Sequence, residues 1–182
     1  MILQIFQLTH KMRLPVSAFE FFTQEAHQAV LDTKGKGAGT LFDQAFPFYL
    51  LVEVEEDSTQ SGLDSFLEQV FEKGWVEDGR ISTSSLEFKE LWGWRENISE
   101  SIEAKGFVRK NDISVPVSKL AHFYKDLMTL LEKSSKNIEV LLFGHVGDGN
   151  IHINYTSSHF KNFEDFAWEA QRIERDVFSL IQ

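Results

Sequence analysis

The amino-acid sequence predicts an α+β fold of the ferredoxin-like type, with a mostly antiparallel sheet and helices on one face. Segments rich in β-branched and aromatic residues alternate with amphipathic helical segments along the 182 residues, a length typical of one domain. The runs IEVLLFGH and IHINY flank a glycine-rich turn and therefore predict a hairpin. Because a hairpin pairs its strands antiparallel, the alternation of strands and helices does not describe a purely parallel sheet.

Helix starts in the first half are marked by a serine followed three residues later by an acidic residue, a pattern of N-terminal capping. The pattern occurs at Ser17 and Glu20, at Ser61 and Asp64, and at Ser84 and Glu87. After Ser61 the apolar residues recur at helical spacing, and Gly74 suits the end of that helix. The predicted elements are a helix over 18–31, a strand over 46–55, a helix over 61–73, a strand over 75–83 and a helix from 84 to Gly106.

The second half repeats this alternation. Pro116 suits the first position of a helix, where a missing N–H costs little. The predicted elements are a strand over 107–115, a helix over 117–133, strands over 138–145 and 151–155, and a closing helix over 160–182. The segment DTKGKGAGT (32–40) lacks the spacing of a phosphate-binding loop, and we interpret it as a surface loop.

Composition excludes several classes of site. The chain has no cysteine, so a metal would be held by His, Asp, Glu or Asn side chains. A net charge of −10 argues against a nucleic-acid partner, which normally meets a basic surface. No run of residues is long and apolar enough for a transmembrane helix, and the N-terminus lacks the pattern of a signal peptide. The 17 phenylalanines predict an aromatic-rich core.

The hairpin GHVGDGNIHIN (144–154) carries the most specific chemical pattern. If the turn is residues 147–150, His145 faces His152 directly, and two imidazoles on one face can converge on one cation. Alternation places Asn154 on the face of His152 and turns Ile151, Ile153 and Tyr155 toward the core. Gly147 and Gly149 suit positive φ angles. A surface hairpin with two solvated histidines is the alternative interpretation.

Basic residues upstream supply a second set of candidates. Arg95 and Ser99 are four residues apart on a predicted helix and therefore share a face, and Lys110 lies in the following strand. A guanidinium offers a planar fork suited to a carboxylate. Taken one by one, these residues are more typical of a solvated surface.

Three motifs in order, LWGWRENISE, VRKNDISVP and LLFGHVGDGNIHIN, resemble the C-terminal domain of FAD-linked oxidases. This family includes D-lactate dehydrogenase, glycolate oxidase and D-2-hydroxyglutarate dehydrogenase, and the first two motifs are most similar to the last branch. The resemblance implies that His145 and His152 bind a divalent metal, zinc or manganese. It also implies that four residues bind substrate: Arg95, Ser99, Lys110 and Asn154.

The resemblance further implies that residues 1–182 form a single substrate- and metal-binding domain, truncated at its C-terminus, without the N-terminal FAD-binding domain. The family's third metal ligand is a glutamate in a segment similar to SGEHG, and the next residue, a histidine, is its general base. Both are expected beyond Gln182, so no catalytic residue is assigned and the isolated chain is expected to be inactive.

The implied parent enzyme oxidises a D-2-hydroxy acid, such as D-2-hydroxyglutarate or D-lactate, to the 2-oxo acid and passes the hydride to FAD. Its implied partners are the small 2-hydroxy acid and the flavin-binding domain; homodimerisation is left open. The implied location is the cytoplasm or the periphery of the inner membrane in bacteria, and the mitochondrion in eukaryotes.

Two other functions remain open at this stage. A non-enzymatic α+β module for ligand binding or assembly would need the hairpin only for its turn. A stand-alone metal hydrolase would need a third ligand within the chain, and Asp148 and His159 are the candidates.

Overall fold

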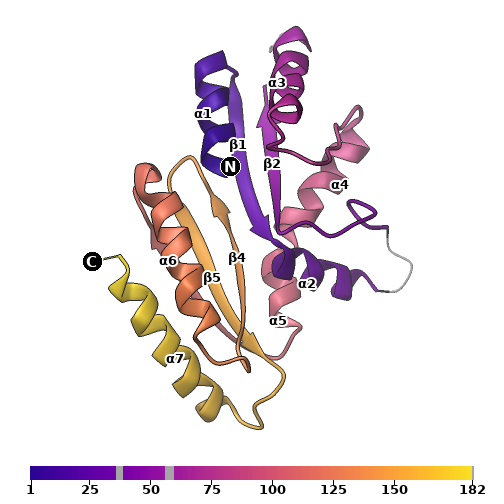
Figure 1. Ribbon diagram of the computed structural model, residues 1–182. Helices are drawn as coiled ribbons and strands as arrows, with labels where there is room; N and C mark the ends of the chain where they lie inside the picture. Colours follow the sequence, from indigo (N-terminus) through magenta and orange to yellow (C-terminus); the bar gives the residue numbers. More distant parts are fainter. Residues whose placement is uncertain (36–38, 56–59, 182) are drawn as a thin grey trace.

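A five-stranded antiparallel sheet forms the centre of the computed structural model, which describes residues 1–35, 39–55 and 60–181 (Figure 1). The strands are β1 Val16–Thr23, β2 Phe48–Val54, β3 Phe107–Ser114, β4 Glu139–His145 and β5 Asn150–Ser157. Their order is β2-β1-β4-β5-β3, and every neighbouring pair is antiparallel. The predicted α+β class and the antiparallel sheet are confirmed.

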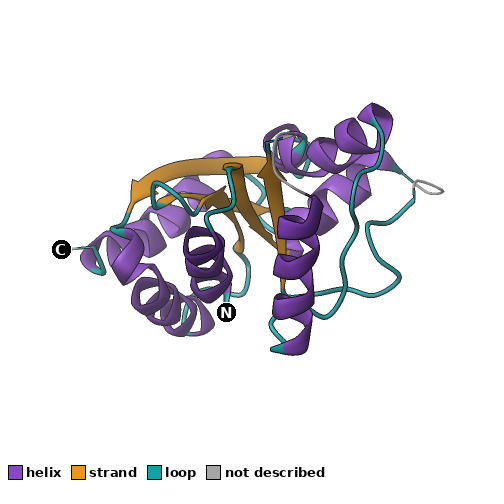
Figure 2. Cartoon of the chain, turned by 90° about the horizontal axis from the view of Figure 1, so that it is seen from above, coloured by secondary structure: helices purple, strands orange, loops and turns teal. Residues whose placement is uncertain are grey.

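Helices pack against both faces of this sheet (Figure 2). They are α1 Ile2–Met12, α2 Gln24–Lys34, α3 Gln60–Glu72, α4 Ser85–Glu96, α5 Ile98–Glu103, α6 Leu120–Glu132 and α7 Phe163–Ser179, with a 3-10 turn η1 Val117–Lys119 before α6. Buried residues of α1, α3, α6 and α7 form a larger core on one face, which we call the major face. Buried residues of α2, α4 and α5 form a smaller core on the other, the minor face.

The expectation of helices on one face alone is therefore wrong, and the strands explain why. Successive residues of a strand point to opposite faces. Leu141 and Leu142 are both buried, as are Phe21 and Phe22, so the central strands are apolar on both sides. A sheet of this kind must be covered on both faces to remove that surface from water.

The predicted helix over 18–31 is wrong in its first six residues, which belong to β1. Ser17 lies at a bulge in the β1–β2 ladder, where its hydroxyl donates to Glu53 Oε1 at 2.8 Å instead of capping a helix. Residues 19–23 are all buried and pair with strands on either side. The burial of this aromatic segment between two neighbours overrides the local capping signal. Helix α2 then begins at Gln24, within the predicted helix.

Other elements differ at their ends. The predicted strand over 75–83 is absent: after Gly74, whose φ of +63° ends α3 as expected, the chain is irregular up to α4. Helix α1 was not predicted. Ser84 caps α4 as expected by accepting from the Glu87 N–H at 3.2 Å, but the helix breaks at Asn97, whose side chain donates to the Gly93 carbonyl.

The remaining predicted elements in the second half are present, with η1 inserted after Pro116. The closing helix runs over Phe163–Ser179 instead of 160–182, and Gln182 lies outside the described residues. Of the expected surface loop over 32–40, residues 32–34 end α2, and 36–38 lie outside the described residues. The β1–β4 ladder joins the two halves of the sheet. It pairs three positions of the described chain, Glu20 with His145, Phe21 with Gly144 and Phe22 with Phe143, whereas each other ladder pairs seven or eight.

A stack of rings fills the minor face beside this ladder. The ring of His27 in α2 lies 4.5 Å from that of Tyr49 and 4.9 Å from that of Trp94, both nearly parallel to it. Lys34 Nζ lies 3.6 Å from the centre of the Trp94 ring. Neither nitrogen of His27 has a hydrogen-bond partner among the described residues. Burial, and to a smaller extent the Lys34 charge, therefore lower the pKa of His27 below its ordinary 6.5.

This stack should make stability depend on pH. The unfolded chain binds the His27 proton more readily than the folded chain does. The contribution of His27 to the free energy of unfolding is therefore complete above about pH 6.5 and is lost as the pH falls below that value. His27→Phe keeps the stacking surface and removes the proton site. We expect the variant to lose less free energy of unfolding than the parent between about pH 7 and pH 5, measured by urea titration. Equal losses in the two proteins would contradict this assignment.

Candidate functional site

The two hairpin histidines lie on the minor face, but not directly opposite each other. The turn covers residues 146–149, so that His145 pairs with Asn150, and His152 pairs with Phe143. The observed register is shifted by two residues from the predicted one. A shift of two retains the face of every side chain, whereas a shift of one would reverse it. The imidazoles are therefore diagonal neighbours, with ring centres 5.8 Å apart and planes at 78°.

Contacts of the turn explain this register. The N–H of Val146 donates to the Phe19 carbonyl at 3.0 Å, which buries the Val146 side chain in the major-face core instead of pairing it with Ile151. The N–H of Gly149 donates to the Val146 carbonyl and closes the turn. Gly149 has the expected positive φ, +69°, but Gly147 does not. As expected, three residues of β5 are buried in the major-face core: Ile151, Ile153 and Tyr155.

Each histidine meets a carboxylate on the strand beside it. Glu20 in β1 pairs directly with His145, and its Oε1 lies 2.6 Å from His145 Nδ1. Asp112 in β3 pairs directly with His152, and its Oδ1 is hydrogen-bonded to His152 Nδ1. A carboxylate accepts, so each Nδ1 carries a proton, and in a neutral imidazole Nε2 is then the nitrogen with a lone pair. Histidines that bind a metal through one ring nitrogen usually donate the N–H of the other to a carboxylate, a carbonyl or a water molecule.

The two pairs differ in exposure. The Glu20 side chain is 5% exposed and that of Asp112 is 68% exposed. The side chain of His145 is 44% exposed, so this histidine opens to solvent, while the ring of His152 packs at 4.6 Å against that of Phe143. The carboxylate is thus buried at β1 and exposed at β3, whereas the histidine beside β1 is more exposed than the histidine beside β3, at 44% against 22%.

Arg95 approaches the same group from α4. Its Nε donates to Glu20 Oε2 at 2.9 Å, and its guanidinium carbon lies 4.6 Å from the centre of the Phe143 ring. Trp92, one turn earlier, donates its indole N–H to Glu53 Oε2 in β2 at 2.8 Å. Two carboxylates of the sheet therefore hold α4, and they leave the Nη groups of Arg95 without a hydrogen bond to any described residue.

The other predicted substrate residues are placed differently. Lys110 and Asn154 are directly paired on β3 and β5, on the minor face. Asn154 is 2% exposed, and its Nδ2 has no partner among the described residues. Lys110 Nζ lies 2.6 Å from Glu103 Oε1, and both side chains are exposed. Ser99 is exposed in α5, beyond the break at Asn97, and makes no hydrogen bond through its side chain in the described chain.

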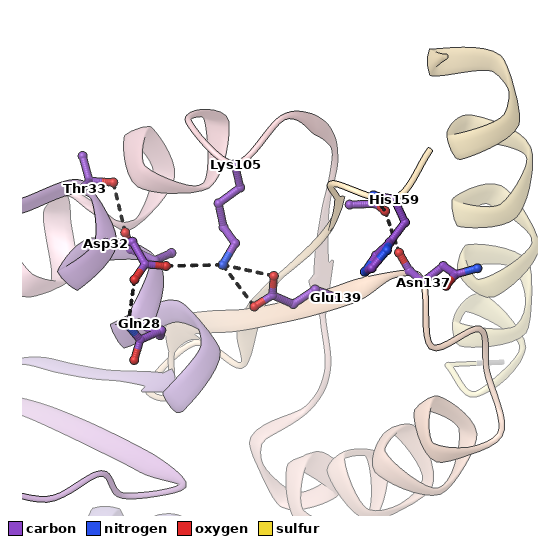
Figure 3. A network of polar contacts seen from close by, with 9 residues as sticks. Gln28, Asp32, Thr33, Lys105, Asn137, Glu139 and His159 are labelled. Atoms are coloured by element: carbon purple, nitrogen blue, oxygen red, sulfur yellow. Dashed lines mark hydrogen bonds and ion pairs between the residues drawn. The ribbon is translucent and has the colours of Figure 1, made fainter. Parts of the chain in front are cut away.

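The far end of the hairpin holds a polar network that serves the fold (Figure 3). Lys105 lies 3.1 Å from Glu139 at the start of β4 and 3.9 Å from Asp32 of α2. His159 is nearby, and its backbone N–H donates to the Ser157 hydroxyl, which donates in turn to the Asn137 carbonyl. His159 therefore follows β5 at the end away from the histidine pair, and Asp148 is exposed in the turn.

No group of three or more His, Asp or Glu side chains within residues 1–35, 39–55 and 60–181 is arranged to hold a metal ion. The stand-alone hydrolase, which needed a third ligand from Asp148 or His159, is thus without support. No helix in the described part of the chain is both long and apolar enough to cross a membrane.

Sequence reasoning missed the two carboxylates. Asp112 could have been predicted, since alternation along KNDISVP places it on the same face as Lys110. Glu20 was misinterpreted as a helix-capping residue, and only the pairing of β1 with β4 brings it to His145.

Comparison with known proteins identifies the family of the chain. Residues 2–172 match the family model of FAD linked oxidases, C-terminal domain. The chain is 36% identical over 174 residues to the D-2-hydroxyglutarate dehydrogenase of Stutzerimonas stutzeri (strain A1501). The aligned residues cover 93% of this chain and 36% of that protein. It is 32% identical to the enzyme of the same name from Xanthomonas citri pv. viticola, over 100% of this chain and 38% of that one.

A third relative is eukaryotic. The mitochondrial D-2-hydroxyglutarate dehydrogenase of Bos taurus is 36% identical over 87% of this chain and 29% of its own length. The chain thus spans about a third of the length of the curated relatives it matches. With nearly all of its length matched by the family model, the chain belongs to the C-terminal domains of FAD-linked oxidases, a family of flavin-dependent oxidoreductases.

Proposed function

We propose that this chain is the substrate- and metal-binding domain of an FAD-dependent D-2-hydroxyacid dehydrogenase. The observation that carries the proposal is a pair of histidines, each held at Nδ1 by a carboxylate, beside a guanidinium on the minor face of the sheet. The name shared by the relatives favours D-2-hydroxyglutarate as the 2-hydroxy acid, ahead of D-lactate.

The donor set suits zinc or manganese. The Nε2 atoms of His145 and His152 would be the donors to the ion, and the carboxylates of Glu20 and Asp112 at Nδ1 would increase their basicity. Two histidines supply two of the three protein ligands that a catalytic zinc site usually takes. When bound, a divalent ion supplies Lewis-acid polarisation of the substrate's 2-hydroxyl, and FAD supplies the acceptor of the hydride.

The remaining residues would bind the acid. The Nη groups of Arg95 form a fork for a carboxylate, and the ion pair with Glu20 fixes the plane of the guanidinium. Lys110 can exchange its exposed contact with Glu103 for a second carboxylate, because a surface ion pair contributes little stability. The unpartnered Nδ2 of Asn154 and the exposed hydroxyl of Ser99 are the further contacts of this proposal.

Arg95 and Lys110 would offer two cations to an anionic substrate in an otherwise acidic protein. A small 2-hydroxy acid and a flavin-binding domain are the proposed partners, and a nucleic acid is not, given the net charge of −10. Several relatives are named mitochondrial, so the proposed location is the mitochondrion for a eukaryotic source and the cytoplasm for a bacterial one.

Calorimetric titration with Zn²⁺ and with Mn²⁺ tests the metal site. We expect the chain to bind the ion and His145→Ala to lower the affinity by about tenfold or more, because one of two imidazole ligands is lost. His122→Ala is the matched control. His122 lies on α6, is 83% exposed and also contacts a carboxylate, that of Asp126, so its loss should leave the titration unchanged. Indistinguishable titrations of the parent and His145→Ala would refute the site.

A further inference from the structure

The carboxylate of Glu20 connects two groups that the proposed function uses separately. Its Oε1 lies 2.6 Å from Nδ1 of His145, and its Oε2 accepts from Nε of Arg95 at 2.9 Å. These partners come from β4 and α4, whereas Glu20 lies in β1, between β2 and β4. The Glu20 side chain is 5% exposed, so its charge is balanced by these neighbours instead of water.

Building on the proposed function, we infer that Glu20 is a positioning residue that fixes the metal ligand His145 and the carboxylate-binding Arg95 as one unit. Accepting the Nδ1–H selects one imidazole tautomer and leaves Nε2 as the ligand atom. Accepting the Nε–H orients the guanidinium plane and leaves both Nη groups for substrate. The two oxygens of one carboxylate thereby determine the relative placement of the metal and the substrate.

A second buried carboxylate in the chain shows what a purely structural pair looks like. Glu174 of α7 is also almost fully buried, and its Oε2 accepts from both Nε and Nη2 of Arg109, at 3.0 and 2.6 Å. That pair ties α7 to β3 through one oxygen and one partner. In Glu20, by contrast, the second oxygen contacts His145, whose side chain is 44% exposed. The buried Arg95 charge would be paired without this second contact.

The substitution Glu20→Gln removes one of the two contacts, with His145 or with Arg95, while it keeps the size of the side chain. A carboxamide has an acceptor oxygen at one end and a donor nitrogen at the other, so it cannot accept from His145 at one end and from Arg95 at the other, as the two oxygens of Glu20 do. If its oxygen stays with Arg95, its N–H₂ group faces Nδ1 of His145 and favours the opposite tautomer, with the proton on Nε2. If its oxygen turns to His145, the Arg95 contact is lost. Either arrangement breaks the unit while the shape of the side chain is kept.

Nitrogen NMR of protein labelled with ¹⁵N-histidine and ¹⁵N-arginine tests the inference without metal, at about pH 8.5, where an ordinary imidazole is neutral. We expect His145 in the parent to carry its proton on Nδ1 and to have an unprotonated Nε2. In Glu20→Gln the Nε2 atom should become protonated, or the Arg95 Nε–H signal should lose its hydrogen-bonded shift. Glu174→Gln, the matched buried carboxylate, should change neither signal.

The parent spectrum alone decides the matter if Glu20→Gln does not fold. An unprotonated Nδ1 on His145 in the parent would overturn the inference, and so would a variant whose His145 and Arg95 signals match those of the parent. In the calorimetric titration, Glu20→Gln should weaken Zn²⁺ binding by about tenfold or more, with Glu174→Gln unchanged. Absence of Zn²⁺ binding by the parent contradicts the proposed function, whereas the tautomer of His145 tests the role of Glu20 without metal.

Discussion

Gly149→Ala is expected to lower the free energy of unfolding by about 3–5 kcal/mol, more than most single substitutions. Gly149 has a φ of +69°, which costs an alanine about 1–2 kcal/mol. A Cβ at this position would also lie 1.9 Å from the carbonyl oxygen of Val115. Because Gly149 and Val115 are also joined by a backbone hydrogen bond of 2.9 Å, the clash can be relieved only by moving the hairpin turn away from the end of β3.

Two other glycines separate these contributions. Gly74 has a similar φ of +63°, but no non-neighbouring atom of the described residues lies within 4 Å of an added Cβ, so Gly74→Ala should show the conformational cost alone, about 1–2 kcal/mol. Gly147 has neither a positive φ nor a contact closer than 3.9 Å, and Gly147→Ala should be almost neutral. Urea titration of the three variants measures the differences. A Gly149→Ala variant no less stable than Gly74→Ala would show that the contact with Val115 does not constrain the turn.

Arg95→Met is expected to cost about 3 kcal/mol, because it leaves the buried Glu20 carboxylate without its arginine. This is the lower end of the range for broken buried pairs, since the Arg95 side chain is 11% exposed and His145 can still donate to Glu20. The aliphatic part of methionine retains packing against Phe143. Chemical denaturation at neutral pH gives the stability change, read from the midpoint at an unchanged denaturant slope.

The double variant Arg95→Met with Glu20→Leu serves as the control for this loss. Removing both charges leaves no unpaired carboxylate, so much of the lost stability should return. If the double variant is as unstable as the sum of its single variants, the ion pair is not the source of the effect. Glu20→Leu also removes the acceptor of the His145 Nδ1–H, so under our proposals the recovered protein should remain weak in metal binding.

The sequence predicts best what local patterns determine. The hairpin, the face shared by His145 and His152, and the cap at Ser84 all follow from alternation and turn chemistry, and all are present. The register of the hairpin is wrong by two residues because Val146 enters the major-face core through its contact with β1. That contact joins residues 127 positions apart, which no local pattern encodes.

The sequence predicts the part of the site that lies in local motifs and misses the part that depends on contacts between distant segments. Arg95, His145 and His152 were selected from motifs, and the structure brings them together around Phe143. Glu20 was assigned to a helix because its local sequence resembles a cap, whereas its true neighbours lie 75 and 125 residues away along the chain. Whether Lys110, Asn154 and Ser99 contact a substrate stays a prediction, and Ser99 is separated from Arg95 by the break at Asn97.

The short ladder between β1 and β4 gives the site a mechanical consequence. The halves β2-β1 and β4-β5-β3 meet along three paired positions, and Glu20 with His145 is the last of them toward the turn. Helix α4 is bonded to the β2-β1 half through Glu53 and Glu20, and His145 belongs to the other half. A ligand bound by both His145 and Arg95 would therefore link the two halves across the β1–β4 ladder. Because such a ligand would bind only the closed sheet, its binding energy would add to the free energy needed to separate the two halves, and the ligand-bound protein would be the more stable one.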